Sequence, residues 1–341
     1  MNNFKIREIE NGENFDPSIF CENVPFTQAS FYGDWQKNLG RIVKRFLVSS
    51  DKEIVAYFQI IKYPLLLGKS YFYIPYGPVT KDFSADFFTY IRQELKKIAK
   101  TENVVFVRLD FTPPIPNDIL SKFFTKAPFY TYHSAYFQPR MEWFLGLEKL
   151  ENEILMEMHE KTRYSIRLAG KKEITTEIIT EDFEKYFEVF YKLMTETAKR
   201  NGFSLHQKNY YKNIFESLSK INSYLSIAKY KEKILCIYQV VIYGEVANYI
   251  YGSSSNEERN RNATYAAHWE AIKYAKQLNC NYYNFGGIEK DNLLNKGMVT
   301  LTLYKKKFGG KEIAHSDFFD VVVSSFWYRL YNFRKLIKKI K

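Results

Sequence analysis

The stretch SYLSIAKYKEKILCIYQVVIYGEVANYIYGSSS (223–255) decides the fold. The polar breaks YKEK and YGE divide it into three apolar runs rich in β-branched and aromatic residues, which predicts three antiparallel strands. The following segment, ATYAAHWEAIKYAKQLN (263–279), has helical spacing, and NYYNFGG (281–287) predicts one more strand. The order of three strands, a helix and a strand indicates a mixed α/β unit.

The first half of the chain has the same order. RFLVSSDKEIVAYFQIIKY (45–63) and KSYFYIPYGPV (69–79) predict three strands, FFTYIRQELKKIAK (87–100) a helix, and VVFVRLD (104–110) a buried strand that ends in an acid. The first of these segments aligns by eye with 225–243. We infer an internal duplication into two α/β domains of about 150 residues that face a cleft. The alternative is a chance likeness of two ordinary meanders.

The composition suits a protein with ample cores and an anionic partner. A length of 341 residues is enough for two ordinary domains. The 28 Tyr and 29 Phe argue against disorder. The 50 Lys and Arg exceed the 38 Asp and Glu, for a formal charge of +12, so nucleic acid, a diphosphate substrate or an anionic membrane fits. Cys21, Cys236 and Cys280 are too widely spaced to predict disulfides or a zinc site, which fits a reducing cytoplasm.

No segment of the sequence predicts a membrane span. Residues 1–15 lack a basic stretch followed by an apolar core, and no window approaches roughly 18 apolar residues. We therefore expect a soluble or peripheral protein. The segment SSFWYRLYNFRKLIKKIK (324–341) predicts a helix with one apolar face, which either packs on the first domain or lies on an anionic membrane. Its basic residues are Arg329, Arg334, Lys335, Lys338, Lys339 and Lys341.

Two further segments carry candidate binding residues. In FTQASFYGDWQKNLG (26–40), polar residues precede an aromatic-rich turn, which predicts a short capped helix ending at Gly40. Between the two halves, apolar spacing over 150–158 predicts an amphipathic helix. Arg163 and Arg167 follow it four residues apart, so on a continuing helix they share one face. This basic cluster is either a solvated helix face or a phosphate site.

Several familiar active sites are missing from the sequence. It has no GxxxxGK[ST] loop, no strand-GxGxxG-helix segment, no HExxH and no GxSxG. Each half has the element order of the acetyltransferase-like fold, but the turns before the two central helices lack a glycine-rich loop for coenzyme A. An acyltransferase that does not use coenzyme A remains. We predict no metal and no cofactor, because the histidines lack metal-ligand spacing: His133, His159, His206, His268 and His315.

The segment YYNFGGIEKDNLLNKGMVTLTLYKKKFGG (282–310) contains the candidate site. A glycine pair after a strand lets the backbone approach a ligand closely, and a polar loop follows it. Tyr304 and three lysines then precede Phe308 and a second glycine pair. The lysines either place ammonium groups around an anionic substrate or form a solvated turn.

Together these motifs resemble the Fem (FemABX) peptidyltransferase family, whose members move an amino acid from aminoacyl-tRNA onto the stem peptide of a peptidoglycan precursor. The matching segments are FTQASFYGDWQKNLG, YIPYGPV, RLD before a proline-containing turn, EKTRYSIRLAGKKEI, ETAKRNGFSLHQKNYY, YGSSSNEERNRNATYAAHWEAIKYAKQLNCNYYNFGGI and YKKKFGG. The resemblance implies an α/β (α+β) fold of two tandem acetyltransferase-like (GNAT-like) domains without a helical-arm insertion. Residues 1–147 plus 315–341 are then the precursor-binding domain, and 148–314 the aminoacyl-tRNA domain.

The resemblance also implies roles for single residues. Lys305 matches a lysine thought to stabilise the negative charge that develops during transfer, and Tyr304 matches its aromatic neighbour. Asp110 matches an acid that contacts the muropeptide or acts as a base, and Lys37 a lysine that meets the precursor diphosphate. Where some relatives have arginine, this chain has His206, so Arg163 or Arg167 is an alternative phosphate contact. Further contacts are expected from aromatic residues of the matching motifs, namely Tyr76, Tyr210, Tyr251 and Phe308.

The implied enzyme is an aminoacyltransferase that is cytoplasmic, with possible peripheral contact of its basic C-terminal helix with the inner face of the membrane. Its partners are aminoacyl-tRNA and a peptidoglycan precursor, either lipid-linked or UDP-linked. Two alternatives stay open. One is an N-acyltransferase of similar fold that acts on another amine, and the other is a non-catalytic RNA-binding or membrane-surface protein on this scaffold.

Overall fold

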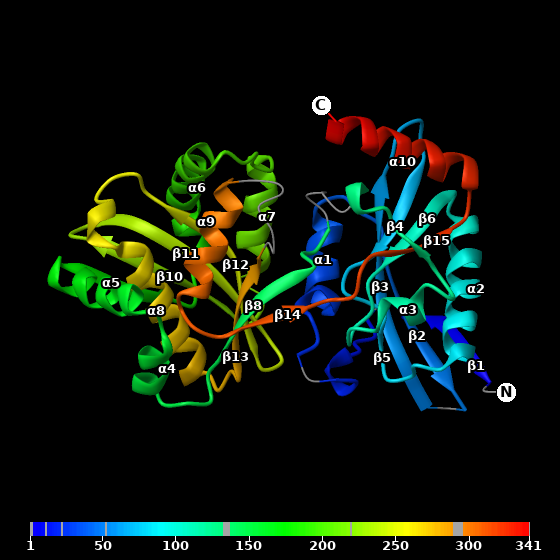
Figure 1. Ribbon diagram of the computed structural model, residues 1–341, viewed down its shortest axis with the longest axis horizontal. Coiled ribbons are helices and arrows are strands. Elements are labelled where there is room, and N and C mark those ends of the chain that lie inside the picture. The colour runs from blue at the N-terminus through cyan, green and yellow to red at the C-terminus, as the bar shows by residue number, and fades with distance from the viewer. Residues whose placement is uncertain are drawn as a thin grey trace. The chain divides into compact units, whose positions relative to one another are not determined.

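The computed structural model of the chain (Figure 1) describes residues 3–10, 12–21, 23–51, 53–131, 137–218, 220–288 and 296–340. The chain forms two compact units, the first of Met1–Arg140 and Ala314–Lys341 and the second of Met141–Ile313. Each unit contains one mixed sheet with helices packed on it. The predicted α/β fold with two similar parts is therefore confirmed.

The first unit is built on a sheet with strand order β1-β2-β3-β4-β6-β15-β7, in which β5 also pairs with β3. Strands β4 and β6 are parallel because helix α2 connects them, and the other pairs are antiparallel. Its elements are β1 (Phe4–Glu8), α1 (Ser30–Asn38), β2 (Val43–Ser50), β3 (Glu53–Pro64), β4 (Ser70–Ile74), β5 (Val79–Thr80), α2 (Ala85–Thr101), β6 (Val104–Leu109), α3 (Asn117–Leu120), β7 (Thr125–Lys126), β15 (Phe319–Val322) and α10 (Ser325–Ile340).

Helix α2 covers one face of this sheet. The Ser84 side chain caps it by accepting a hydrogen bond from the Phe87 backbone N–H at 3.1 Å. Its buried residues recur at helical spacing and join the core of the first unit: Phe87, Phe88, Ile91, Leu95 and Ala99. The apolar spacing that predicted this helix is therefore the spacing that packs it on the sheet.

The opposite face of β6 packs against the C-terminal helix α10. Side chains alternate along a strand, so Val107 and Leu109 point into the core under α2, while Phe106 points toward α10. The ring of Phe106 contacts Tyr328 and Tyr331, with centroids 5.4 and 5.0 Å apart. The C-terminal segment is thus an integral part of the first unit. Among the described residues, no helix is both long and apolar enough to cross a bilayer.

A buried ion pair joins β15 to β6. Arg108 donates from Nε and Nη2 to the two carboxylate oxygens of Asp320, at 2.8 and 2.7 Å, and both side chains are fully buried. The Tyr328 hydroxyl donates to the same carboxylate at 2.7 Å. A bidentate pair with an additional donor satisfies most of the polar atoms that burial removes from water. This pair ties residues 212 positions apart in sequence.

The second unit repeats this plan with a sheet of order β14-β8-β13-β12-β11-β10-β9. Strands β12 and β13 are parallel and are connected by α8. Its elements are β8 (Met141–Gly146), α4 (Glu151–Glu157), α5 (Glu160–Lys171), β9 (Ile174–Ile179), α6 (Phe187–Asn201), α7 (Lys208–Leu218), β10 (Ser223–Tyr230), β11 (Lys233–Tyr243), β12 (Val246–Ser254), α8 (Ala263–Gln277), β13 (Tyr282–Gly287), α9 (Lys296–Lys306) and β14 (Lys311–Ala314).

The two sheets correspond strand by strand. The series β2, β3, β4, α2, β6 matches β10, β11, β12, α8, β13, and the register irregularity near the end of β2 has its counterpart in β10. Each sheet is extended beyond its parallel pair by an antiparallel strand from another part of the chain, β15 beside β6 and β8 beside β13. The repeated order predicted from the sequence is confirmed, whereas these added strands were not predicted.

Two predicted details of the fold are wrong. The first domain was predicted to include 141–147, but β8 pairs with β13 and therefore lies in the second sheet. The predicted helix ending at Gly40 exists as α1, but no polar side chain caps it. The buried Thr27 Oγ1 and Gln28 Nε2 donate instead to the Pro75 carbonyl, at 3.1 and 2.6 Å. These side chains anchor the segment before α1 to the residues that follow β4.

Removing one partner of the buried ion pair should destabilise the first unit strongly. We expect Asp320→Ala to lower the free energy of unfolding by roughly 3 to 5 kcal/mol, because the Arg108 guanidinium is left buried without its carboxylate. The control is Asp317→Ala, which removes a partly exposed pair with Lys126 and should cost about 1 kcal/mol or less. Urea denaturation measures both. Equal losses in the two variants would contradict a special role for the buried pair.

Candidate active site

The parallel strands β12 and β13 separate soon after they pair. Their register runs only from Val246↔Tyr282 to Asn248↔Asn284, although β12 continues beside β11 as far as Ser254. Strand β13 turns at its glycine pair, where its register with β8 also shifts. Gly286 has a φ of +74°, a backbone conformation that favours glycine. The turn at this glycine therefore coincides with the end of the paired register between β13 and β12.

Lys305 points to this place of separation. Its side chain is 4% exposed, and its Nζ donates to the Gly287 carbonyl at 2.6 Å. A Cβ on Gly286 would lie 3.8 Å from the same nitrogen. Burial lowers the pKa of Lys305 to about 8, and the Glu142 carboxylate opposes this shift. At neutral pH the side chain is therefore still mostly an ammonium ion, although it is almost completely removed from solvent.

A buried polar network holds the turn beside Lys305. Asn284 Nδ2 donates to Glu142 Oε1 at 3.1 Å and to Asn248 Oδ1 at 3.2 Å. Asn284 Oδ1 in turn accepts from the Gly286 N–H at 2.7 Å. Because the side chains of Asn284, Asn248 and Glu142 are buried, the network fixes the path of β13 and keeps one carboxylate within electrostatic range of the ammonium group.

His268 and aromatic rings surround the same region. The Tyr304 hydroxyl donates to the Thr264 carbonyl at 3.0 Å, and its oxygen lies 3.1 Å from His268 Nδ1. Burial and the neighbouring Lys305 hold the pKa of His268 well below its usual value. Phe308 packs against the imidazole, with ring centroids 5.3 Å apart. The imidazole is therefore neutral, and Lys305 supplies the positive charge of this cluster.

A second cluster contains three residues that the family resemblance singled out. His206 precedes α7 and Tyr210 lies in its first turn. Their rings stack with centroids 4.1 Å apart. The Tyr210 hydroxyl lies 3.0 Å from the hydroxyl of Tyr251, which belongs to the part of β12 that has separated from β13. All three side chains are partly exposed. They provide hydroxyl and imidazole groups along the same strand that borders the Lys305 cluster.

In the first unit, Asp110 is fully buried at the end of β6. Its Oδ1 accepts from the Tyr76 backbone N–H at 2.7 Å, and its Oδ2 accepts from Tyr73 at 3.3 Å and from the Arg140 guanidinium. Burial raises the pKa of Asp110 to about 6, against the lowering effect of Arg140 and His315. Asp110 and Tyr76 are thus neighbours, but the carboxylate is enclosed by protein groups.

The remaining predicted residues lie on helix surfaces. Lys37 is exposed in the last turn of α1, 3.6 Å from Asp34. The predicted continuous helix is interrupted between α4 and α5, and both arginines lie on α5. Arg163 donates to the carbonyls of Met156, at 3.0 Å, and Met158, so it closes the end of α4. Arg167 is exposed on α5. These contacts give Arg163 a structural role and favour Arg167 as a phosphate contact.

Sequence reasoning missed the residues that surround Lys305 and Asp110. The missed residues come from segments that are distant in the sequence: His268, Glu142, Asn284 and Arg140. The one sequence signal for them is that they are polar residues within or beside apolar segments. Helix α9, which carries Lys305, was also not predicted. His133, Lys341 and the predicted polar loop at 289–295 lie outside the described residues. Within the described ranges, no group of His, Cys, Asp or Glu side chains is arranged to hold a metal ion.

The FemAB family model matches residues 20–127, 124–236 and 226–336, which together cover most of the chain. The chain belongs to the FemAB family. Among curated FemAB relatives, the lipid II:glycine glycyltransferase of Staphylococcus aureus strain MRSA252 is 23% identical over 90% of each chain. The glycyltransferase of strain MSSA476 is 22% identical over the same shares.

Solved structures agree with this FemAB assignment. The crystal structure of FemX has a TM-score of 0.82 and 21% identity, and the match covers 96% of this chain and 100% of FemX. A tandem GNAT protein from the clavulanic acid biosynthesis pathway has a TM-score of 0.55 and 8% identity, over 94% and 99% of the two chains. The fold is thus a tandem GNAT-like fold. As a FemAB protein, the chain is an acyl-transferring enzyme.

The buried Lys305 ammonium should lower the stability of this FemAB protein at neutral pH. Its pKa of about 8 lies below the value of about 10.4 in an unfolded chain, so the unfolded state binds more protons between these values. Stability therefore rises with pH across this window, by roughly 3 kcal/mol for this group. We expect Lys305→Met to be more stable than the parent at pH 7 by up to about that amount.

Urea denaturation at a series of pH values measures this difference. The advantage of Lys305→Met should shrink as the pH rises from 8 toward 10.5, since the parent protein then buries a neutral amine. Lys306→Met is the matched control, because Lys306 is exposed and its ammonium group lies over the face of Trp143. This variant should change stability by less than about 1 kcal/mol. A Lys305→Met protein less stable than the parent at pH 7 would contradict the assigned burial cost.

Proposed function

We propose that this protein transfers an amino acid from aminoacyl-tRNA to an amine on the stem peptide of a peptidoglycan precursor. The observation that carries the proposal is the buried, protonated Lys305 at the place where β12 and β13 separate. Its FemAB membership supports the reaction class, and the curated relatives named lipid II:glycine glycyltransferase support a precursor as acceptor. The name of these relatives makes glycine the first amino acid to test.

The reaction asks little covalent chemistry of the protein. The amino acid is joined to tRNA by an ester, which is already activated toward an amine. The amine nitrogen forms a bond with the ester carbonyl carbon, the bond from that carbon to the tRNA oxygen breaks, and a proton passes from the amine to the departing hydroxyl. The protein has to hold the neutral amine within about 3 to 3.5 Å of the carbonyl carbon.

Lys305 stabilises the charge that develops during this reaction. Negative charge accumulates on the carbonyl oxygen as the amine adds, and a fixed ammonium ion in a solvent-poor site opposes it strongly. The Gly287 carbonyl and the Glu142 carboxylate hold the ammonium in place, while neutral His268 does not compete for the anion. Backbone groups of β12 beyond Asn248 lie next to this site and are positioned to orient the ester.

Asp110 acts in this proposal as a positioning residue rather than as the base. It has no exposed surface, and its oxygens accept from Tyr76, Tyr73 and Arg140. Its contact with the Tyr76 N–H fixes a residue that the family resemblance places near the precursor. The amine proton then leaves through a carboxylate of the substrate or through the departing hydroxyl, which does not require Asp110 to be accessible.

The two units divide the substrates in this proposal. The first unit binds the precursor, with exposed Lys37 meeting its diphosphate, and the second unit binds aminoacyl-tRNA. Exposed Arg167 and the partly exposed cluster of His206, Tyr210 and Tyr251 supply phosphate, hydroxyl and stacking contacts on the second unit. The enzyme works at the cytoplasmic side of the membrane, where such precursors and charged tRNA are both present.

A reconstituted transfer assay tests this function. The protein is incubated with tRNA charged with a labelled amino acid and with either a lipid-linked or a UDP-linked muropeptide precursor. We expect label on the stem peptide, lost when the ester of the charged tRNA is hydrolysed beforehand. Lys305→Ala should still bind the precursor but should form little product. Lys306→Ala, which changes the neighbouring exposed lysine, should form product like the parent.

Two outcomes of this assay contradict the proposal. One is the lack of product with every charged tRNA and both precursors, while the folded protein still unfolds cooperatively. The other is transfer from an acyl-coenzyme A to the same amine, which would favour the N-acyltransferase alternative. If Lys305→Ala forms as much product as the parent, the proposed reaction stands, but the role assigned to Lys305 in it is wrong.

A further inference from the structure

The outer side of α10 carries an exposed apolar stripe. Phe326, Leu330, Phe333 and Ile337 recur at the spacing of one helical face, and Leu336 lies beside them. All five side chains are exposed, with Phe326 71% and Phe333 60% exposed. Large apolar side chains gathered on one helix face mark an interaction surface more often than an ordinary solvated helix.

This stripe is not the side by which α10 packs on its own unit. That packing uses Tyr328, which is buried and bonded to Asp320, and Tyr331, whose ring contacts Phe106. The sequence left open whether the C-terminal helix packs on the first domain or meets a membrane. One face does pack, and the other remains exposed.

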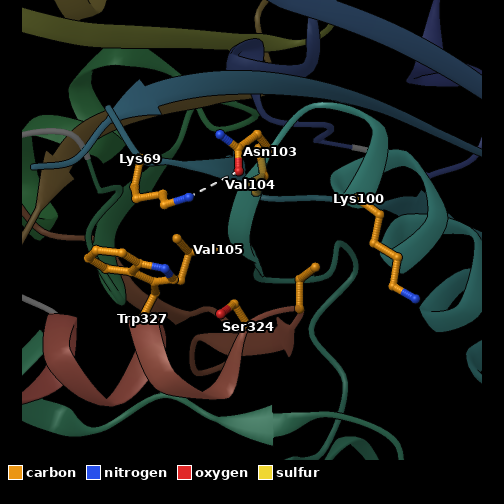
Figure 2. Close-up of a pocket in the computed structure, with 8 residues that line it drawn as sticks. Lys69, Lys100, Asn103, Val104, Val105, Ser324 and Trp327 are labelled. Carbon is orange, nitrogen blue, oxygen red and sulfur yellow. Dashed lines mark hydrogen bonds between the residues drawn. The ribbon is translucent and has the colours of Figure 1, made fainter. Parts of the chain in front are cut away.

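A second apolar projection lies beside the first turn of α10. The turn between β3 and β4 exposes Leu66 and Leu67, the latter 76% exposed, and is closed by the backbone of Lys69. Lys69 Nζ lies 5.2 Å above the Trp327 ring and 3.2 Å from Asn103 Oδ1. Figure 2 shows Lys69 extended above Trp327. Both residues line a cavity of about 230 Å³, whose other lining residues are Lys100, Asn103, Val104, Val105, Val323 and Ser324. Lys69, two residues after Leu67, therefore links this turn to the first turn of α10.

The charge of this surface points to an anionic partner. Helix α10 contains no acidic residue, and the exposed Arg329 and Arg334 flank the apolar stripe on its two sides. Lys69 adds a further cation beside Leu67. An apolar stripe between basic margins is the pattern of a helix that lies in a membrane interface, where each basic residue near anionic lipid contributes about 1 kcal/mol. A second copy of α10 would meet this surface with like charge.

We propose that the membrane-docking surface, defined as the α10 stripe (Phe326, Leu330, Phe333, Leu336 and Ile337) with Leu66 and Leu67, binds the interface of an anionic lipid bilayer. The apolar side chains enter the boundary between headgroups and acyl chains, and the flanking arginines meet lipid phosphates. The surface lies entirely within the first unit, so the proposal needs no particular arrangement of the two units. It holds whether or not the transfer reaction is the one proposed above.

Co-sedimentation with lipid vesicles tests the surface in the full-length protein without any transfer substrate. We expect binding to vesicles that contain phosphatidylglycerol, much weaker binding to vesicles of phosphatidylcholine alone, and loss of binding as salt is raised. The variant Phe326→Gln/Leu330→Gln/Phe333→Gln should weaken binding to the anionic vesicles by roughly tenfold or more. Leu66→Gln/Leu67→Gln should weaken it by a smaller factor.

The matched control changes three exposed apolar residues that are not members of this surface, Ile19→Gln/Met156→Gln/Leu278→Gln. It should bind the vesicles like the parent, and the urea midpoints of all variants should agree. Parent-like binding by the α10 variant overturns the proposal, as does equal binding to anionic and neutral vesicles. If light scattering shows a dimer that the α10 variant abolishes while vesicle binding is lacking, the surface is a contact between two copies instead.

Discussion

The buried Lys305 ammonium group is the constraint around which the candidate site of the second unit is arranged. Removing Lys305 from water costs about 1.4 kcal/mol for each unit by which its pKa falls, so a protein without a use for this charge would gain stability from an apolar side chain. The surrounding structure reduces that cost without eliminating it. The Gly287 carbonyl accepts a hydrogen bond from Nζ, and Glu142 supplies a carboxylate through a network that also fixes the turn of β13. Neutral His268 completes the surroundings without adding a second positive charge.

The same sheet plan produces different results in the two units. In the first unit, β4 and β6 remain paired from Ser70 to Ile74, and the chain beyond them stays connected through the hydrogen bond from Asp110 N–H to the Gly77 carbonyl at 3.1 Å. In the second unit, β12 and β13 part after Asn248. The buried Asp110 carboxylate follows β6 in the first unit, whereas the buried Lys305 ammonium group contacts the end of β13 in the second. The two units thus share one sheet plan, but the parallel pairing of the second unit ends earlier along its strands.

Much of the fold was predictable because its main elements bury their own periodic apolar faces. The strands β2 to β4 and β10 to β12, and the helices α2 and α8, follow local patterns that need no knowledge of distant residues. The strands β8 and β15 were missed because their pairing partners, β13 and β6, are distant from them in the sequence. Helix α9 was missed because its segment, KGMVTLTLYKK, is rich in β-branched residues and has little amphipathic pattern.

The candidate site was predictable only in part for the same physical reason. Lys305, Tyr304 and Phe308 lie close together in sequence, so a family resemblance could select them. Their partners Glu142 and His268 come from β8 and α8, and only the folded chain brings them near. Burial, which lowers the pKa of Lys305, is likewise a property of the packed chain rather than of the lysine-rich motif.

The central claim is that the positive charge of Lys305 accelerates aminoacyl transfer, and chemical rescue tests it most directly. Under single-turnover conditions with saturating substrates, Lys305→Ala should transfer the amino acid to the stem peptide about 10² to 10³ times more slowly than the parent. Added propylammonium should restore part of this rate by placing a cation where the side chain was removed, and propanol of similar size should not. A parent-like rate in Lys305→Ala, or equal rescue by propanol and propylammonium, would contradict the claim.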